Sequence, residues 1–512
     1  MGAEEPAGLR KPKPYYPIFI AAFPVVAVYS LNLAMVPLGD IWRPLAISVG
    51  GVVSLCLVLS LLMRSVAKGA ALGALVFVLF ATFGSIMRYT GPIVLEIADA
   101  LVIGFALYRL IRHKGNLAHW TRVANFGATV LIVLPLAQIV VRKPHRGADA
   151  YLHVSLPVHA TASTVASRPD IFFIIVDGYG REDQLQRVMS YSNQPFVQQL
   201  RSRGFYVADQ SHSNYVQTQL SLTATLNLSF LQDYPKTFPR DSDDRSVLLD
   251  GMDRSFIAAY LKRLGYAYIS VTSGFNEVKF DSADVTYSGA LSLTMIEDAL
   301  VQLTPVTVVD QPITSLYDDR RKSLRGAFAN LKYLATPAGG PRFVVAHILA
   351  PHPPFVFKPD GEDFRQALPF GFWDGSHYMS VGGTPDMYRT GYVNQVQYLN
   401  SQLLQIVDAL VAKAGGKKPV IIIEGDHGSK LGLDQEIVEK TDLHEAFSNF
   451  MAFFVPDSVK ALLYPKITSF NTFRALLDGL FGEKLPMLPD RSFYSPFSMP
   501  YRFTEVTDRV AD

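Results

Sequence analysis

The chain has 512 residues, more than one domain normally holds, and a net charge of +2 without a long basic run. This charge balance argues against nucleic acid as a partner. The one cysteine, Cys56, lies in an apolar stretch, so neither an internal disulfide nor a thiolate metal cluster can form. Hydrophobic residues make up 49% of the chain, and nearly all of the excess lies before residue 142. We therefore expect a membrane domain followed by a globular domain.

Five apolar segments in the N-terminal part each approach the ~20 residues needed to cross a bilayer. They are Tyr16–Val36, Trp42–Met63, Ala70–Met87, Ile93–Ile111 and Val123–Val141. They predict a transmembrane domain of about five helices over residues 1–145. A cleaved signal peptide is the alternative for the first segment. That alternative is disfavoured because the segment starts late, lacks an obvious cleavage site and is followed by further apolar segments.

Basic residues beside these segments predict the orientation. They lie before the first segment, between the second and third, and between the fourth and fifth: Arg10, Lys11, Lys13, Arg64, Lys68, Arg109, Arg112, Lys114 and Arg122. The positive-inside rule makes these three regions cytoplasmic, so the N-terminus is inside and everything after Val141 is outside. The basic residues between 142 and 146 are a contrary signal. Glu96 and Asp99 in the fourth segment are either interfacial or line a pocket.

Residues 146–168 lack periodicity and predict a linker. From Pro169 onward, short β-branched or aromatic runs alternate with helical patterns. The expected strands are Asp170–Val176, Tyr268–Thr272, Phe343–Leu349, Val420–Ile423 and Met451–Val455, and the expected helices are Phe196–Gly204, Arg254–Leu264, Arg320–Leu334 and Tyr392–Ala412. This alternation predicts an α/β domain over residues 169–512, with a mostly parallel central sheet covered by helices.

Ligands of such sheets bind beyond the carboxyl ends of the strands. The first expected strand is followed by Asp177, and the fourth by Glu424-Gly425-Asp426-His427-Gly428. Two carboxylates and an imidazole suit a divalent cation. An acidic residue at a strand end is common in any α/β protein, so Asp177 alone is a weak signal. Asp426 and His427 are a stronger one, because two ligand types directly follow a buried run.

Two further stretches carry chemistry. Residues 213–223 are rich in hydroxyls, and Thr218 and Ser221 lie where a helix can begin. These hydroxyls are either simple helix caps or part of a reaction site. In a reaction site, a hydroxyl beside a cation would be the nucleophile, and the amides of the helix N-terminus would face the phosphate. The stretch from His347 to Phe355 follows another expected strand. A lone loop histidine is usually structural, but His352, held between prolines, can also donate a proton to phosphate or to a leaving oxygen.

Together these motifs resemble the alkaline phosphatase and sulfatase superfamily. More narrowly, they resemble its membrane-anchored transferases, which include phosphoethanolamine transferases and lipoteichoic acid synthases. Asp177-Gly and Asp426-His427-Gly are similar to the family's metal motifs, and Thr218 followed by Ser221 fits its nucleophile frame. The resemblance implies one divalent ion, Zn²⁺ or Mn²⁺, held by Asp177, Thr218, Asp426 and His427. It also implies Thr218 and His352 as catalytic residues and substrate contacts from His347, His352, His444 and Ser221.

The resemblance implies a monomeric enzyme that lies in a bacterial inner membrane and has an exported catalytic domain. It would transfer a phosphoethanolamine- or phosphoglycerol-type head group from a lipid donor to an envelope glycolipid or polymer through a phospho-threonine. The alternatives are a phosphodiesterase or phosphatase with the same intermediate, and an inactive binding protein. The sulfatase sequence Cys-x-Pro-Ser-Arg is absent, which argues against sulfate hydrolysis by a modified cysteine. The absent disulfides, and Asp177 in place of a glutamate, depart from the lipid A transferases.

Overall fold

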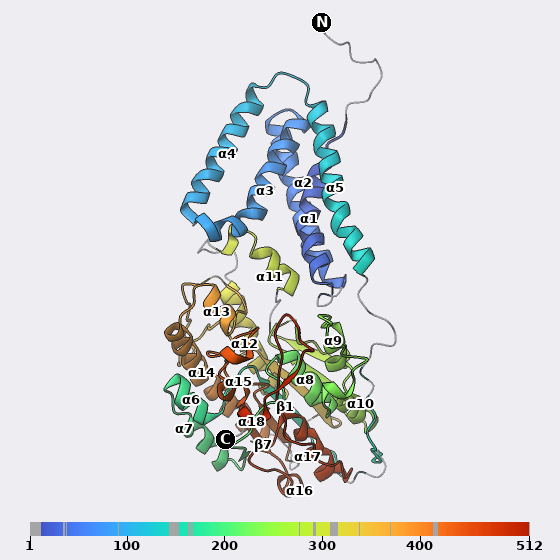
Figure 1. Cartoon of the computed structure of the whole chain (residues 1–512), viewed down its shortest axis with the longest axis vertical. Coiled ribbons are helices and arrows are strands. Elements are labelled where there is room, and N and C mark those ends of the chain that lie inside the picture. The colour runs from blue at the N-terminus through green and yellow to red at the C-terminus, as the bar shows by residue number, and fades with distance from the viewer. Residues whose placement is uncertain are drawn as a thin grey trace. The chain divides into compact units, whose positions relative to one another are not determined.

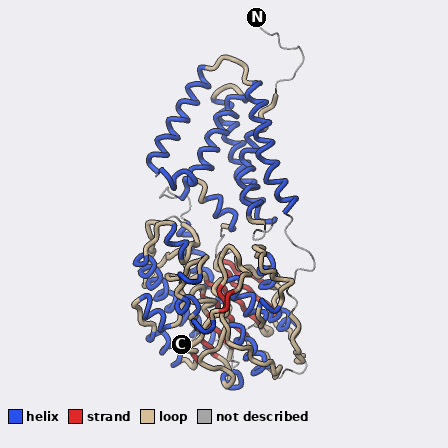
Figure 2. The backbone as a smooth tube through the Cα atoms, viewed as in Figure 1, coloured by secondary structure: helices blue, strands red, loops and turns tan. Residues whose placement is uncertain are grey.

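The computed structural model describes residues 12–33, 36, 38–90, 92–142, 152, 154–161, 165, 167–275, 277–289, 293–307, 316–336, 338–368, 370–412 and 418–510. Contacts divide these residues into a helical unit, drawn from 1–144 and 293–311, and an α/β unit, drawn from 145–292 and 312–512. Within the described chain, strands occur only in the α/β unit, as Figure 2 shows in red. Arg10 and Lys11, and the basic cluster beyond Arg142, lie outside the described residues.

Each of the five apolar segments forms a helix. The helices are α1 (Tyr16–Leu31), α2 (Trp42–Leu62), α3 (Val66–Thr90), α4 (Pro92–Arg112) and α5 (Ala118–Arg142), with a 3-10 turn η1 (Leu38–Ile41) before α2. Three stretches of the described chain are long and apolar enough to cross a membrane: Leu38–Leu62, Val66–Met87 and Ala118–Val141. Helix α1 is shorter, and acidic residues interrupt α4. Membrane anchoring is therefore supported, whereas five crossings and their orientation stay predictions.

The helical unit includes a segment from the middle of the chain that the sequence assigned to the catalytic domain. Helix α11 (Met295–Val301) and the 3-10 turn η3 (Pro305–Thr307) pack on α1 and α3. The expected continuous domain over 169–512 is therefore interrupted by residues 293–307. The segment is too short to show the repeated apolar pattern of a membrane helix, so its sequence carried no signal.

The α/β unit is built on a seven-stranded sheet (Figure 1). Its strands, in spatial order, are β2 (Tyr206–Val207), β7 (Met451–Phe454), β6 (Val420–Glu424), β1 (Ile171–Val176), β5 (Arg342–Ile348), β3 (Ala267–Thr272) and β4 (Val285–Ser288). Strands β6, β1, β5, β3 and β4 are parallel, and β7 and β2 complete one edge in antiparallel pairing. The expected mostly parallel sheet is confirmed, and all five expected strands begin and end within one residue of their predicted bounds.

Helices cover both faces of the sheet because every residue of β1 is apolar and buried. Phe172, Ile174 and Val176 point into one core, and Ile171, Phe173 and Ile175 into the other. The first core includes α7 (Gln194–Ser202), α12 (Leu316–Tyr333) and α14 (Pro385–Ala412). The second includes α8 (Thr218–Asn227), α10 (Phe256–Arg263) and α17 (Ser469–Phe481).

Shorter elements complete the α/β unit. They are α6 (Glu182–Met189), η2 (Leu231–Asp233), α9 (Ser246–Asp253), α13 (Ser376–Ser380), η4 (Val438–Lys440), α15 (Leu443–Phe447), α16 (Asp457–Lys460), α18 (Thr507–Val510) and a two-stranded sheet of β8 (Phe493–Tyr494) and β9 (Thr504–Glu505).

The described part of the expected linker packs on the α/β unit. Backbone amides of His159 and Ala160 donate to the carboxylate of Glu483 over 2.6 and 2.9 Å, and Leu152 is buried. The remainder of 146–168, at 146–151, 153, 162–164 and 166, lies outside the described residues. From Leu152 onward the described linker therefore belongs structurally to the α/β unit.

Candidate metal centre and active site

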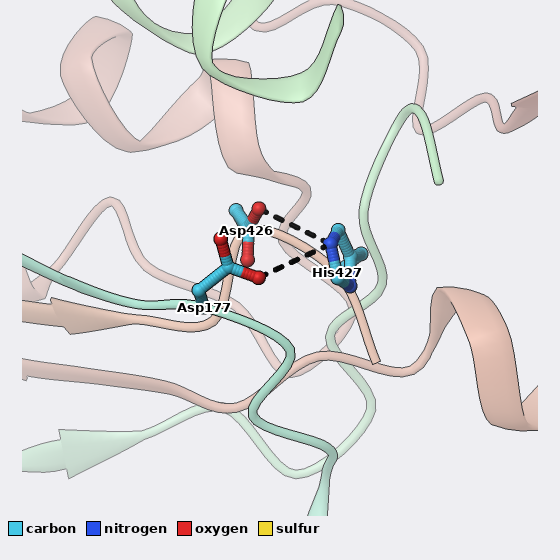
Figure 3. A group of neighbouring side chains, drawn as sticks. All are labelled: Asp177, Asp426 and His427. Atoms are coloured by element: carbon cyan, nitrogen blue, oxygen red, sulfur yellow. Dashed lines mark ion pairs between the residues drawn. The ribbon is translucent and has the colours of Figure 1, made fainter. Parts of the chain in front are cut away.

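Two neighbouring parallel strands deliver three candidate metal ligands to one point. Asp177 follows β1, and Asp426 and His427 follow β6. Nε2 of His427 lies 3.3 Å from Oδ2 of Asp426 and 3.6 Å from Oδ1 of Asp177. Dashed lines mark these two pairs in Figure 3. One ligand atom from each residue lies within 4.8 Å of the others, and all three side chains are fully buried. The parallel pairing explains this, because both strands end at the same edge of the sheet.

The unpaired atoms of this cluster fit a divalent cation. Asp177 Oδ1 and Asp426 Oδ2 are buried and accept no hydrogen bond within the described part of the chain. Burial, and then the charge of Asp426, raise the pKa of Asp177. Nδ1 of His427 lies 2.9 Å from the carbonyl oxygen of Gly428, which can only accept, so Nδ1 carries the proton and the Nε2 lone pair faces the carboxylates. Burial lowers the pKa of His427, which keeps its imidazole neutral. Lone pairs of Asp177 Oδ1, Asp426 Oδ2 and His427 Nε2 therefore converge on one point, as a metal site requires.

Thr218 is brought to the same point by α8. It is the first residue of this ten-residue helix. Its hydroxyl oxygen lies 3.2 Å from Nε2 of His427 and 3.5 Å from Oδ2 of Asp177. The first-turn amides of a helix lack intrahelical partners and favour an anion. The arrangement places a hydroxyl between the candidate metal ligands and a helix terminus that favours anions.

Ser221 and His347 support the ligands. The Ser221 hydroxyl donates to the main-chain oxygen of Asp426 over 2.6 Å, and Nε2 of His347 lies 3.1 Å from Oδ2 of Asp177. Burial lowers the pKa of His347 to about 4, so its neutral ring donates this single hydrogen bond. Both residues were expected to contact substrate. Each is 1% exposed and contacts a candidate ligand, and its contact with substrate stays a prediction.

His352 lies in the loop after β5. Its backbone amide donates to the main-chain oxygen of Asp177 over 3.1 Å. Its Nδ1 lies 2.6 Å from the carbonyl oxygen of Pro353, and its Nε2 lies 3.5 Å from Oδ2 of Asp374. Asp374, which the sequence patterns did not single out, thus orients the histidine. It comes 22 residues after His352, in a stretch without strand or helix periodicity.

His444 lies on α15, next to Glu445, whose carboxylate holds the loop that follows the candidate ligand His427. The carboxylate of Glu445 accepts hydrogen bonds from the Ser429 hydroxyl and from the backbone amides of Leu431 and Gly432. His444 does not belong to the three-residue metal group. Its expected contact with substrate stays a prediction.

Two positively charged side chains near the candidate metal centre were not anticipated from the sequence. Arg245, the N-cap residue of α9, is buried and donates to the side-chain oxygens of Gln217 (2.7 Å) and Gln219 (3.1 Å), which flank Thr218. It therefore fixes the first turn of α8. Nothing in the local sequence signals this, because Arg245 lies more than 25 residues from its partners.

Lys430 is 6% exposed, and among the described residues no hydrogen bond or ion pair is found for its ammonium group. Its charge lowers the pKa of both Asp177 and His427, after larger effects of burial and, for Asp177, of its neighbours. A buried cation beside an acidic cluster is suited to hold an oxyanion. Its position three residues after His427 is a signal that the sequence offered.

Comparison with known families shows which family the chain belongs to. The family model described as Sulfatase matches residues 169–457, more than half of the chain. The chain belongs to the sulfatase family. The expected alkaline-phosphatase-like superfamily and fold are thus confirmed, and this sulfatase-family protein has an enzyme fold associated with phosphoryl or sulfuryl transfer. No curated protein matches its sequence.

Solved structures similar to this sulfatase-family protein include transferases and hydrolases. The C-terminal periplasmic domain of EcEptC from Escherichia coli, in complex with Zn, is 9% identical, with a TM-score of 0.39 and coverage of 66% of this chain and 93% of that one. The corresponding domain of phosphoethanolamine transferase EptC from Campylobacter jejuni is 14% identical (TM-score 0.38; 64% and 93%). Phosphonate monoester hydrolase of Agrobacterium radiobacter is 16% identical (TM-score 0.41; 64% and 80%). Similarity at this level assigns no substrate.

Proposed function

We propose that this protein is a membrane-bound, metal-dependent transferase. It moves a phosphoethanolamine- or phosphoglycerol-type head group from a lipid donor to an envelope glycolipid or polymer. The observation that carries this proposal is the Thr218 hydroxyl, held within 3.5 Å of two candidate metal ligands at the start of a helix. The three helices capable of spanning a bilayer support a lipid donor, which need not leave the membrane.

Asp177, Asp426, His427 and the Thr218 hydroxyl would hold the ion, Zn²⁺ or Mn²⁺. When bound, it would supply Lewis acidity that lowers the pKa of the hydroxyl and offsets charge on phosphate. Zinc is favoured where both metals are present. A formylglycine nucleophile made from cysteine is excluded because the one cysteine of the chain, Cys56, lies in α2 of the helical unit.

Each of the protein residues then has its own role in the reaction. Thr218 Oγ1, its proton having passed to solvent, attacks phosphorus as an alkoxide, and the bond from phosphorus to the diacylglycerol oxygen breaks, leaving the head group on a phospho-threonine. His352 donates a proton to the departing oxygen. Lys430 and the amides of α8 bind the non-bridging oxygens. An acceptor hydroxyl next attacks phosphorus, loses its proton to His352 and releases Thr218.

The same intermediate attacked by water would make the protein a phosphodiesterase, so the test must separate the two reactions. The full-length protein is reconstituted in liposomes containing phosphatidylethanolamine and phosphatidylglycerol, with or without an envelope glycolipid extract. We expect diacylglycerol release that depends on the acceptor, with the head group appearing on the glycolipid. Release that is independent of acceptor and yields free head-group phosphate indicates a hydrolase. A rate equal to that of Thr218→Ala overturns both.

We also propose that the α/β unit lies outside the cytoplasm. The described basic residues Lys13, Arg64, Lys68, Arg109 and Lys114 support a cytoplasmic side that carries the N-terminus. Protease added to intact spheroplasts should therefore remove the α/β unit. Protection of that unit until the membrane is permeabilised would contradict this orientation.

A further inference from the structure

The chain leaves the α/β unit once and returns to it. Strand β4 ends at Ser288 in the α/β unit, residues 293–307 belong to the helical unit, and α12 resumes the α/β unit at Leu316. Residues 290–292 and 308–315, which connect the units, lie outside the described residues. We call residues 293–307 the anchor segment. It contains none of the candidate catalytic or metal-binding residues, so its contacts need another explanation.

The first contact of the anchor segment is apolar. Ile296 of α11 is 1% exposed, and Leu300, one turn later on the same helix face, packs beside it. Both join a cluster with side chains of α1, of the connection after it and of η1, namely Val25, Tyr29, Leu33, Val36 and Ile41. Helix α11 thus buries one face against the membrane helices.

The second contact is a two-pronged ion pair. Nε and Nη2 of Arg43, at the start of α2, donate to the two carboxylate oxygens of Glu297, whose side chain is 7% exposed. Glu297 also closes a capping box with Thr294, which fixes the first turn of α11. Bidentate pairing of this kind is directional, so it sets the position of α11 on the bundle.

The third contact joins backbones. The amide of Gly84 in α3 donates to the carbonyl oxygen of Leu303 over 2.9 Å. A Cβ at Gly84 would lie 2.0 Å from the carbonyl oxygen of Gln302. Glycine is therefore required for this close approach. In total, the anchor segment makes three chemically different contacts with three of the membrane helices.

We propose that the anchor segment fastens the catalytic unit to the membrane helices, so that turnover of bilayer-borne substrate depends on it while chemistry at the metal centre does not. The dependence on lipid rests on the proposed function. The physical reason is that the metal centre is assembled from β1, β5, β6 and α8, all inside the α/β unit. Releasing the anchor leaves this assembly intact but lengthens the free chain between the α/β unit and the membrane helices, which lowers the effective concentration of the active site at a bilayer-borne substrate.

A charge-swap cycle tests the docking in the full-length protein. Arg43→Glu and Glu297→Arg are made singly and together, with Arg64→Glu as a control charge reversal. Hydrogen exchange of peptides within 293–307 is the first readout and requires no activity. We expect each single reversal to speed exchange there, the double variant to recover most of the protection, and peptides covering β1 and β6 to stay unchanged.

Turnover is the second readout. Each single reversal should lower lipid turnover about tenfold while leaving hydrolysis of soluble bis(p-nitrophenyl) phosphate within about twofold. Equal loss on both substrates, or unchanged exchange in the single variants, overturns the proposal. If the wild type proves inactive on lipids, the exchange result still decides whether the segment docks.

Gly84→Ala gives an independent disruption, with Gly127→Ala as its matched control. Both glycines lie in apolar helices, but a Cβ at Gly127 meets nothing within 4 Å. Gly84→Ala should speed exchange of 293–307 and lower lipid turnover, and Gly127→Ala should do neither. Equal exchange rates and equal lipid turnover in the two variants would contradict an anchoring role of residues 293–307.

Discussion

Thr218 Oγ1 lies 3.2 Å from Nε2 of His427, so the start of α8 and the turn after β6 share one reaction centre. If Thr218 is the nucleophile, Thr218→Ala should lower kcat by roughly 10⁴-fold on any phosphodiester substrate. Thr218→Ser keeps a hydroxyl and should retain measurable turnover. Steady-state kinetics with bis(p-nitrophenyl) phosphate will check both. An alanine variant that keeps more than a tenth of wild-type kcat would exclude a nucleophilic role.

The orphaned oxygens of Asp177 and Asp426 predict that a divalent ion stabilises the α/β unit. Zn²⁺ at about 100 times its dissociation constant should add roughly 2.7 kcal/mol to the free energy of unfolding. Asp426→Asn removes one metal ligand and one of two repelling charges. The metal-free variant should therefore be no less stable than the metal-free wild type, and Zn²⁺ should no longer stabilise the variant. Thermal unfolding with Zn²⁺ or with EDTA measures this. The control is Asp408→Asn, at an exposed residue paired with Arg203; equal responses of both variants to Zn²⁺ would refute the site.

Lys430 should act on the substrate oxyanion. Lys430→Ala is expected to lower kcat/KM by about 10²-fold, as for the loss of one preorganised oxyanion donor. Lys430→Arg keeps the charge and should recover part of the loss. Lys440→Ala, at an exposed lysine ten residues later, should have no effect. Comparison of the three rates with one soluble phosphodiester provides the measurement. Equal rates for the Lys430→Ala variant and the wild type would show that the ammonium does not contact the reacting group.

Glu445 predicts a pH dependence of stability. Burial raises its pKa from 4.5 to about 7, so the folded state favours the protonated carboxyl. This contribution to stability is fully present below the unfolded pKa and is lost as pH rises through about 7. Glu445→Gln cannot titrate. The wild type should therefore lose up to about 3 kcal/mol relative to Glu445→Gln between pH 4.5 and 8. Denaturant unfolding followed by tryptophan fluorescence tests the sign. A wild type that gains relative stability with rising pH would contradict the argument.

Local sequence pattern was enough to predict part of this protein. Strands β1 and β6 are uninterrupted apolar runs, so their ends, and with them Asp177 and Asp426, follow from the residue pattern alone. Contacts that link distant residues do not follow from it. The hydrogen bond from Ser221 to Asp426 spans 205 residues, and that between His347 and Asp177 spans 170. The contacts by which Ser221 and His347 hold the candidate ligands were therefore not anticipated, and their contact with substrate stays a prediction.

The anchor segment could not be predicted for a related reason. Ile296 and Glu297 look like an ordinary amphipathic turn within the catalytic domain. Their partners, Tyr29 and Arg43, lie more than 250 residues earlier, and nothing in either stretch signals the pairing. The same holds for Arg245, whose contacts with Gln217 and Gln219 depend on the packing of α9 against α8.

Mass spectrometry of the peptide that contains Thr218 tests the central claim most directly. The full-length protein is incubated with donor lipid in the absence of acceptor, quenched and digested. We expect Thr218 to gain a phosphate bearing the donor's head group, and we expect added acceptor to remove it. An active protein in which Thr218 stays unmodified while another residue carries the adduct would contradict the account.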